Sequence, residues 1–155
     1  MNLASLLSED QIIPAVRATE RWPAIVELVD HLCATDRLKA EHRDKVLQLL
    51  QEREDKTSTG IGSGVAIPHA FAEEIDEVIT VFGRSEDGIE FDSIDNAPVQ
   101  FIILFIVPKD EYQMHLRTLA AIAKMFADSR VRKRLAAATT GAELLSILGS
   151  RPART

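Results

Sequence analysis

The feature that most restricts the fold is an apolar run at residues 99–107, Val-Gln-Phe-Ile-Ile-Leu-Phe-Ile-Val, which Pro108 closes. It is far shorter than the roughly 20 apolar residues that a membrane-spanning helix needs. A run that is apolar on both faces and rich in β-branched and aromatic residues is typical of a central strand covered by helices on each side. An α/β protein without membrane insertion is therefore expected.

Segments whose apolar residues have helical spacing come before and after this strand in the sequence. Amphipathic helices are predicted over residues 20–34, with Thr19 as the N-cap, and over residues 39–53. The C-terminal third is predicted to be helical throughout. Its three helices are expected at residues 114–126, at residues 131–138 and from about residue 140, followed by a frayed tail at residues 151–155.

Shorter strand candidates precede the central run. Val65-Ala66-Ile67 is a short apolar strand ended by Pro68, and residues 78–83 form a second candidate. Residues 88–98 alternate apolar and polar side chains, as a hairpin or edge segment does. Helices, strands and helices in this order predict an α/β sandwich with mixed strand directions. A length of 155 residues fits a single domain, and no repeat or domain boundary interrupts it.

The charge balance argues against a nucleic-acid partner. The net charge is −6, whereas a face that binds nucleic acid has to be basic to displace counterions from phosphates. A local basic cluster is expected to be a solvated helix face, and the alternative is that it docks an acidic partner or a phosphate. The cluster consists of Arg130, Arg132, Lys133 and Arg134.

The cysteine content and the N-terminal residues indicate in which cellular compartment the protein is expected. Cys33 is the only cysteine, so no intrachain disulfide is possible, and its apolar neighbours predict a small core residue. The first eight residues lack the basic start and the long apolar stretch of a signal peptide. Since no membrane span is expected either, the prediction is a cytoplasmic protein.

A glycine-rich segment interrupts the pattern at residues 55–64, Asp-Lys-Thr-Ser-Thr-Gly-Ile-Gly-Ser-Gly, and is expected to form a loop of tight turns. The spacing of Gly60, Gly62 and Gly64 is not that of the dinucleotide fingerprint, and no GxxxxGK[ST] phosphate loop occurs. Two interpretations stay open. The glycines only make turns, or they bring backbone N–H groups close to an anion.

The four histidines are the main candidates for chemistry. His31 and His42 are expected to be solvated surface residues of their helices. His69 should lie just past a strand end and His115 should open a helix, which are places where α/β proteins bind ligands and hold catalytic groups. By position alone, each of these two residues could equally be a polar residue of a turn or of a first helical turn.

Metal chemistry and hydrolysis are poorly supported. No HExxH pair and no Cys/His cluster accompanies the histidines, so no metal site is expected. Gly62-Ser63-Gly64 lacks the five-residue GxSxG pattern of a nucleophile elbow.

The segment Ser-Thr-Gly-Ile-Gly-Ser-Gly-Val-Ala-Ile-Pro-His at residues 58–69 resembles the active-site segment of enzyme IIA of the bacterial phosphotransferase system, fructose/mannitol type, including its nitrogen-regulatory branch. Three other segments resemble the same family: Glu52-Arg53-Glu54, Phe-Asp-Ser-Ile-Asp-Asn-Ala-Pro-Val at residues 91–99, and His-Leu-Arg-Thr-Leu at residues 115–119. The similarity covers about residues 19–148, which is nearly all of one domain spanning residues 1–155.

This resemblance implies a mixed, roughly five-stranded sheet flanked by helices and a phosphorylated histidine at His69. Arg53 matches the family's supporting arginine, and His115 matches its second active-site histidine. Ser63 stands where Asn is common, and Ala70 stands where Gly commonly follows the histidine, so these departures bear on partner preference more than on chemistry. The implied phosphate and partner loop consists of Thr59, Gly60, Gly62, Ser63 and Gly64.

The chemistry suits these residue types. An imidazole has an ordinary pKa of about 6.5 and is mostly neutral at pH 7, so His69 can attack phosphorus without a separate base or a cofactor. Phosphoryl transfer depends on positioning and on stabilising negative charge. Arg53 can supply a permanent bidentate charge, and His115 at a helix N-terminus can donate a further hydrogen bond. The small glycines would let a partner bring its own histidine close.

The expected function is that of a phosphotransferase component in sugar uptake. It would accept a phosphoryl group from the phosphocarrier protein HPr and pass it to enzyme IIB. The alternative is a nitrogen-regulatory protein whose phosphorylation state decides which target proteins it binds. A third interpretation, less favoured than these two, is a scaffold in which His69 is inert.

Overall fold

The computed structural model describes residues 3–149, and the predicted tail at residues 151–155 lies outside them. The described chain forms a mixed six-stranded sheet and five α-helices. The strands are β1 (Ile12–Ile13), β2 (Gly60–Gly62), β3 (Val65–Ala66), β4 (His69–Ala72), β5 (Ile79–Ile89) and β6 (Val99–Pro108). The helices are α1 (Arg21–Ala34), α2 (Arg43–Lys56), α3 (Tyr112–Ala127), α4 (Ser129–Ala137) and α5 (Gly141–Gly149).

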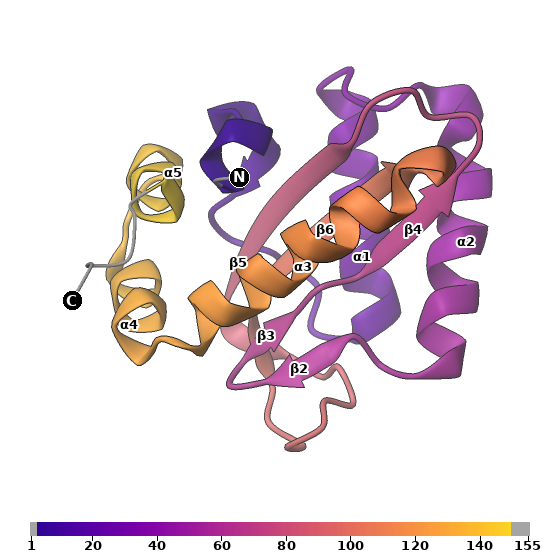
Figure 1. Ribbon diagram of the computed structural model, residues 1–155. Coiled ribbons are helices and arrows are strands. Elements are labelled where there is room, and N and C mark those ends of the chain that lie inside the picture. The colour runs from indigo at the N-terminus through magenta and orange to yellow at the C-terminus, as the bar shows by residue number, and fades with distance from the viewer. Residues whose placement is uncertain (1–2, 150–155) are drawn as a thin grey trace.

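The predicted central strand is β6. It pairs with the antiparallel β5 on one side, and on the other side it pairs in parallel with β3 and then with β4 (Figure 1). β2 adds antiparallel to β3, and the two-residue β1 adds parallel to β5. The α/β class and the mixed strand directions are confirmed. Strands as short as β1, β2 and β4 are not predicted individually, because two to four residues carry too little periodic signal.

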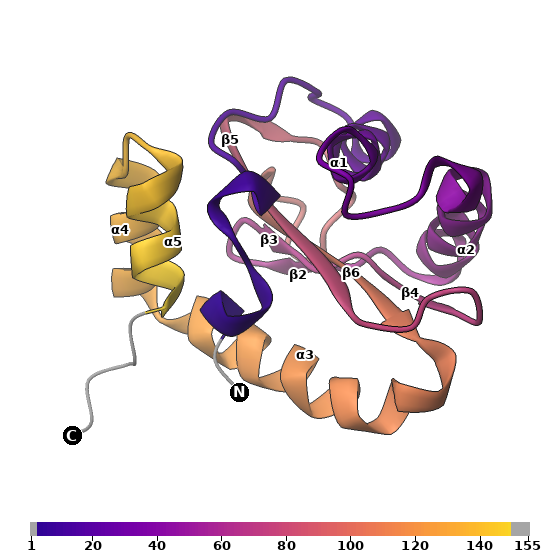
Figure 2. The ribbon, with the colours of Figure 1, turned by 90° about the horizontal axis from the view of Figure 1, so that it is seen from above.

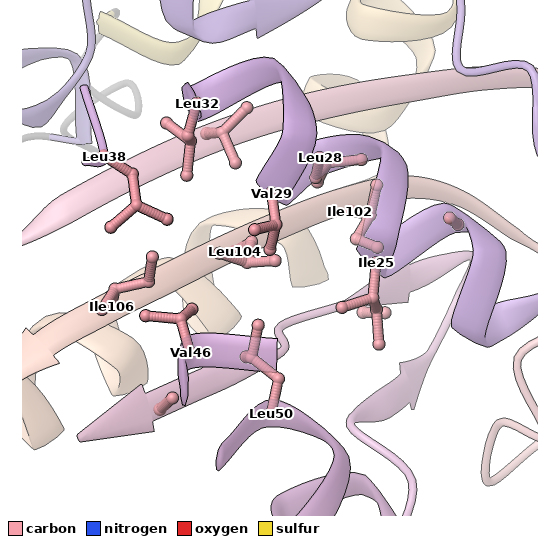
Figure 3. Packing of buried hydrophobic residues seen from close by; sticks show 14 of the residues in the cluster. Ile25, Leu28, Val29, Leu32, Leu38, Val46, Leu50, Ile102, Leu104 and Ile106 are labelled. Atoms are coloured by element: carbon pink, nitrogen blue, oxygen red, sulfur yellow. The ribbon is translucent and has the colours of Figure 1, made fainter. Parts of the chain in front are cut away.

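Helices cover both faces of the sheet, so β6 is buried on both sides. Figure 2 shows α1 and α2 above the sheet and α3 below it, with α4 and α5 at one side. Ile102, Leu104 and Ile106 of β6 pack in the core with residues of α1 and α2, as Figure 3 shows. Phe101, Ile103 and Phe105 alternate with them and pack in a second core on the α3 side. No helix within residues 3–149 is long and apolar enough to span a membrane.

Several predicted boundaries were wrong. The N-cap of α1 is Glu20 and not Thr19. The helix predicted over residues 39–53 begins at Arg43, after a 3-10 turn, and continues to Lys56, so the first part of the predicted glycine loop is helical. The middle of that loop is strand β2, because pairing with β3 outweighs the poor strand propensity of glycine. The strand predicted at residues 78–83 continues to Ile89.

A buried arginine connects the sheet to the C-terminal helices. Arg84 of β5 is 5% exposed and donates through Nε to the Pro14 carbonyl oxygen at 3.0 Å. Its Nη1 donates to the carbonyl oxygens of Leu135, at 3.0 Å, and of Ala138 at the end of α4. Carbonyl groups at a helix C-terminus carry partial negative charge, which suits a guanidinium. Arg84 therefore holds β5, the N-terminal segment and α4 together.

Replacing Arg84 with Met is expected to lower the free energy of unfolding by about 2 kcal/mol, because Met fills the space but leaves three carbonyl oxygens without their donor. Urea denaturation followed by circular dichroism measures this change. Arg130→Met on the exposed surface of α4 is the control and should shift the midpoint little. An Arg84→Met midpoint equal to that of the wild type would show that these hydrogen bonds contribute nothing net.

Candidate functional site

His69 lies where the chain passes from β3 to β4. β3 ends at Ala66, Ile67 and Pro68 follow, and His69 is the first residue of β4. The Pro68 carbonyl oxygen accepts a hydrogen bond from the Phe105 N–H of β6 at 3.0 Å, which fixes the link between β3 and β4 to the central strand. His69 is therefore just past the end of β3, as predicted, but it also begins a strand that the sequence pattern does not show. Its side chain is half-buried.

The hydrogen bonds of His69 define its tautomer. Nδ1 lies 2.9 Å from the carbonyl oxygen of Ile67. A carbonyl oxygen can only accept, so Nδ1 carries the proton and Nε2 keeps a free lone pair. Arg53 donates its Nε–H to that Nε2 at 3.3 Å, which agrees with Nε2 being the acceptor. The ring thus presents Nε2 as the nucleophilic nitrogen, beside a guanidinium.

The environment keeps this imidazole neutral. Burial lowers the pKa of His69 below its ordinary value, and the positive charge of Arg53 lowers it further. The hydrogen bond to Ile67 and the negative charge of Glu54 oppose this shift without reversing it. A nucleophilic lone pair exists only on the neutral ring, so the lowered pKa favours the reactive form at neutral pH.

The pH dependence of His69 follows from this sign. At a pH of about 6.5, where an unperturbed histidine is half protonated, we expect less than half of the His69 rings to be protonated. The unfolded chain takes up this proton first, so the contribution of His69 to stability is present above about pH 6.5 and is lost as pH falls through the folded-state pKa. An NMR titration of the His69 ring measures the midpoint. A midpoint at or above the ordinary value would contradict the burial and the Arg53 contact.

Arg53 reaches His69 from the last turn of α2. A cation is favourable at a helix C-terminus because of the macrodipole. Its Nη1 donates to the Thr57 carbonyl oxygen at 2.7 Å, which ties the side chain to the end of its own helix and leaves Nε aimed at His69. The structure therefore brings together two residues that are 16 positions apart and that the family resemblance had paired.

The glycines form the β2–β3 hairpin and its surroundings. Gly62, Ser63 and Gly64 have φ values of 96°, 58° and 78°, a left-handed stretch that favours glycine. The Ser63 N–H donates to Asp95 Oδ2 at 2.9 Å, which lowers the pKa of that carboxyl. A Cβ at Gly60 would collide with the Ser93 hydroxyl and lie 3.0 Å from the Ser93 Cα, so only glycine fits there. Turn geometry and close packing thus account for these glycines, and their proposed contact with a phosphoryl group stays a prediction.

Glu54 is the site residue that the sequence analysis did not single out. It is 5% exposed, and it accepts the Thr59 N–H through Oε2 at 3.2 Å and the Thr59 hydroxyl through Oε1. Arg21 of α1 lies 3.7 Å from the same Oε2. Thr59, 3% exposed, is thus anchored to the end of α2 just before the hairpin. In the sequence, Glu54 belongs to the segment Glu52-Arg53-Glu54 that resembles the family. No sequence pattern indicates that its side chain is buried.

His115 lies on the buried side of α3 and is 3% exposed. Its Nδ1 has no hydrogen-bond partner among the described residues. It lines a cavity of about 810 Å³ whose walls include Glu77 and Val78 but neither Arg53 nor His69. Ring contacts provide a link: His69 packs edge-on against Phe71 at 5.9 Å, and Phe71 packs against Tyr112, one turn before His115, at 5.1 Å. The structure shows no hydrogen bond between the two histidines.

The remaining candidates from the sequence have structural surroundings. Cys33 is partly buried and packs against the α1/α2 core, and burial raises the pKa of its thiol. His31 and His42 are half-exposed, and Nε2 of His31 lies 2.6 Å from the Asp10 carbonyl oxygen. In the basic cluster, Arg130 pairs with Asp128. Within residues 3–149, no group of three or more His, Cys, Asp or Glu side chains is arranged to hold a metal ion.

The site therefore contains a histidine whose Nδ1 is held by a carbonyl oxygen and whose unprotonated Nε2 lies beside an arginine. An unprotonated imidazole nitrogen can act as a nucleophile. Residues 5–150 match the family described as "Phosphoenolpyruvate-dependent sugar phosphotransferase system, EIIA 2". Because this match covers nearly the whole chain, the protein belongs to that family of phosphotransferase enzyme IIA proteins.

Relatives carry two kinds of name. A nitrogen regulatory protein of Bradyrhizobium diazoefficiens is 29% identical over 153 residues, which are 99% of this chain and 98% of that protein. The fructose-specific EIIA component of Haloferax volcanii is 34% identical over 102 residues, 66% of each chain. The likeness to the family is therefore spread over the whole domain.

Solved structures share the fold. The crystal structure of nitrogen regulatory protein IIA-Ntr from Neisseria meningitidis has a TM-score of 0.86 and 27% identity, covering 94% of this chain and 98% of that one. Enzyme IIA of mannitol from Escherichia coli, in complex with phosphorylated enzyme IIB, has a TM-score of 0.77 at 22% identity, with 94% and 98% coverage. The resemblance inferred from the sequence is confirmed.

Proposed function

We propose that this protein carries a phosphoryl group on Nε2 of His69, accepting it from phosphorylated HPr and passing it to an enzyme IIB. The observation that carries this proposal is the pair of hydrogen bonds on the His69 ring. The Ile67 carbonyl oxygen holds the proton on Nδ1, and the unprotonated Nε2 accepts the Arg53 Nε–H. The ring is in the protonation state that nucleophilic attack on phosphorus requires.

The transfer step needs no proton to move. The Nε2 lone pair forms a bond to phosphorus while the N–P bond of the donor's phosphohistidine breaks, and that electron pair returns to the donor ring. His69 keeps its Nδ1 proton and becomes a positively charged ring that bears the phosphoryl group. The carbonyl oxygen of Ile67, 2.9 Å from Nδ1, faces the positive charge as it develops. Neither a separate base nor a cofactor takes part.

Negative charge on the phosphoryl oxygens calls for cationic and hydrogen-bonding partners. Arg53 is already beside Nε2. When the Nε2 lone pair bonds to phosphorus, the Arg53 Nε–H loses its acceptor and can donate to the phosphoryl oxygens instead. His115, with its buried Nδ1 unpaired, has an unused hydrogen-bonding atom one turn from the Tyr112 contact. We infer that it contributes to the phosphorylated state, as the family resemblance implied.

The partner would dock over the hairpin and the loop beside it. Ile61 on β2 is 41% exposed, and Ile94 on the loop that follows Phe91 is 79% exposed. The two segments are joined because the Ile94 N–H donates to the Gly60 carbonyl oxygen at 3.3 Å. Exposed aliphatic side chains on a hydrogen-bonded frame suit a transient interface with HPr or enzyme IIB. The mannitol enzyme IIA that shares this fold is known in complex with its phosphorylated enzyme IIB.

Reconstitution tests this function. The purified protein is incubated with phosphoenolpyruvate, enzyme I and HPr, and we expect an acid-labile phosphoprotein that forms only when HPr is present. Addition of an enzyme IIB should then remove the label. A wild-type protein that stays unlabelled, under conditions where HPr itself is phosphorylated, would overturn the proposal.

The same experiment separates transport from regulation. The relatives include both nitrogen regulatory proteins and a fructose-specific component, so their names favour neither role. Rapid transfer of the phosphoryl group to an enzyme IIB is the expected result for sugar uptake. A phosphoprotein that is stable in the presence of each enzyme IIB tested would instead favour the regulatory alternative.

A further inference from the structure

Glu54 occupies a place that is unfavourable for a carboxylate. It is 5% exposed, although charged side chains are almost never buried without partners. It also lies in the last turn of α2, where the helix macrodipole disfavours negative charge. Its nearest cation is Arg21, at 3.7 Å, which is longer than a strong charge-assisted hydrogen bond. Helix stability alone therefore does not explain an acidic residue here.

Two hydrogen bonds connect this carboxylate to the segment that precedes the hairpin. Thr59 donates both its N–H and its hydroxyl to Glu54, one to each oxygen. The Thr59 carbonyl oxygen in turn accepts the Ile67 N–H at 3.0 Å. Ile67 is the residue whose own carbonyl oxygen holds Nδ1 of His69. A continuous chain of hydrogen bonds thus leads from Glu54 through Thr59 and Ile67 to the ring.

The charge of Glu54 also balances the site. Arg53 stabilises a phosphoryl group, but as a cation it opposes the positive charge that the ring acquires when Nε2 bonds to phosphorus. The charged groups that face this ring are Arg53 and Glu54 of α2, and Arg21 of α1 faces Glu54. Burial and Arg53 lower the pKa of His69, whereas Glu54 raises it. Glu54 is the carboxylate that favours the positively charged ring.

We propose that Glu54 is a positioning residue of the phosphoryl transfer, which fixes the His69 ring through Thr59 and Ile67 and stabilises the cationic phosphorylated ring. This inference rests on the function proposed above. In the phosphorylated state, four charged groups then form two opposed pairs: the phosphoryl group faces Arg53, and the positively charged His69 ring faces Glu54.

The variant Glu54→Gln separates the charge from the hydrogen bonds. The amide oxygen can accept the Thr59 N–H, and the amide nitrogen can donate to the Thr59 hydroxyl oxygen, so both connections survive while the charge is lost. Glu52→Gln is the matched control, because it removes the same charge two residues earlier from an exposed side chain that accepts a hydrogen bond from Gln48 on the same helix. Circular dichroism and thermal unfolding verify that both variants are folded.

We expect Glu54→Gln to slow phosphoryl transfer from phospho-HPr on the order of tenfold and to lower the pKa of the His69 ring, both free and phosphorylated. Glu52→Gln should leave the rate and the pKa unchanged. Rate constants come from quenched-flow labelling and pKa values from NMR titration. A merely structural anchor would change neither pKa, because the hydrogen bonds are kept.

The outcomes distinguish this inference from the proposed function. A labelled wild type together with a Glu54→Gln variant of equal rate and equal ring pKa would overturn the role of Glu54 and leave the phosphocarrier intact. A wild type that accepts no label would overturn both. A Glu54→Gln variant that slows while its ring pKa stays constant would overturn the charge-balancing role.

Discussion

The His69→Gln variant is expected to accept no phosphoryl group from phospho-HPr while remaining folded. An amide nitrogen has no basic lone pair, so the step that forms the N–P bond cannot occur. Gln can still accept the Arg53 N–H with its side-chain oxygen, and the half-buried position at the start of β4 tolerates its similar size. Labelling with radioactive phosphoenolpyruvate measures the loss, which should be complete.

The control for this variant is His42→Gln, which changes a half-exposed histidine in the turn before α2 and should be labelled as fully as the wild type. Thermal unfolding confirms that both variants are folded. If His69→Gln retained an acid-labile label, the nucleophile would be another residue, and the assignment of the site to Nε2 of His69 would have to be abandoned.

Arg53→Gln is expected to slow phosphoryl transfer roughly 100-fold, the size of the effect when one preorganised donor to developing negative charge is removed. Its Nε lies 3.3 Å from Nε2 of His69, the nitrogen that we propose bonds to phosphorus. Charge reversal, Arg53→Glu, should slow transfer still more, because an anion then faces the phosphoryl oxygens. Arg53→Lys should recover only part of the rate, because an ammonium cannot bond both to Thr57 and in a bidentate manner to phosphate.

Single-turnover transfer from phospho-HPr measures these rates. Lys56→Gln, which removes a cation from an exposed position at the end of the same helix, is the control and should be nearly as fast as the wild type. An Arg53→Gln variant that matches the control would remove Arg53 from the transfer step. The His69 pKa provides an independent check: since Arg53 lowers it, the Gln variant should titrate at a higher pH than the wild type.

The frame of the fold could be predicted from the sequence because its main signals are strong. Nine consecutive residues of β6 with one polar member predict burial on both faces, and the alternation of Ile102 and Ile103 between two cores confirms it. The amphipathic helices were placed correctly, within a few residues at their ends. Helix ends depend on capping and on local packing, and for that reason Thr19 was mistaken for the N-cap and α2 extends three residues beyond Arg53.

The site could be predicted only in part. The resemblance of residues 58–69 selected His69 and that of residues 52–54 selected Arg53, and the structure has these two side chains in contact at 3.3 Å. The tautomer could not be predicted, because it depends on where the Ile67 carbonyl oxygen lies relative to the ring. Glu54 escaped detection for a similar reason: an acidic residue near a helix end is ordinarily solvated, and only its packing against Thr59 and Arg21 shows that it is buried.

The glycine segment illustrates how a correct composition signal can indicate the wrong element. Three glycines in five residues correctly predicted tight turns, and the structure gives Gly62 and Gly64 positive φ values. They also hid strand β2, whose pairing with β3 depends on neighbours later in the chain. The reason for glycine at position 60 is the Ser93 side chain 33 residues away, which no local pattern contains.

The most direct test of the central claim is the site of the phosphoryl group on His69, determined by nitrogen–proton correlation NMR of the uniformly nitrogen-labelled protein before and after phosphorylation. The unphosphorylated ring should show a protonated Nδ1 and an unprotonated Nε2, because the Ile67 carbonyl oxygen accepts from Nδ1. After phosphorylation, coupling to phosphorus is expected at Nε2 of His69. Coupling at Nδ1, or at any other histidine, would contradict the account.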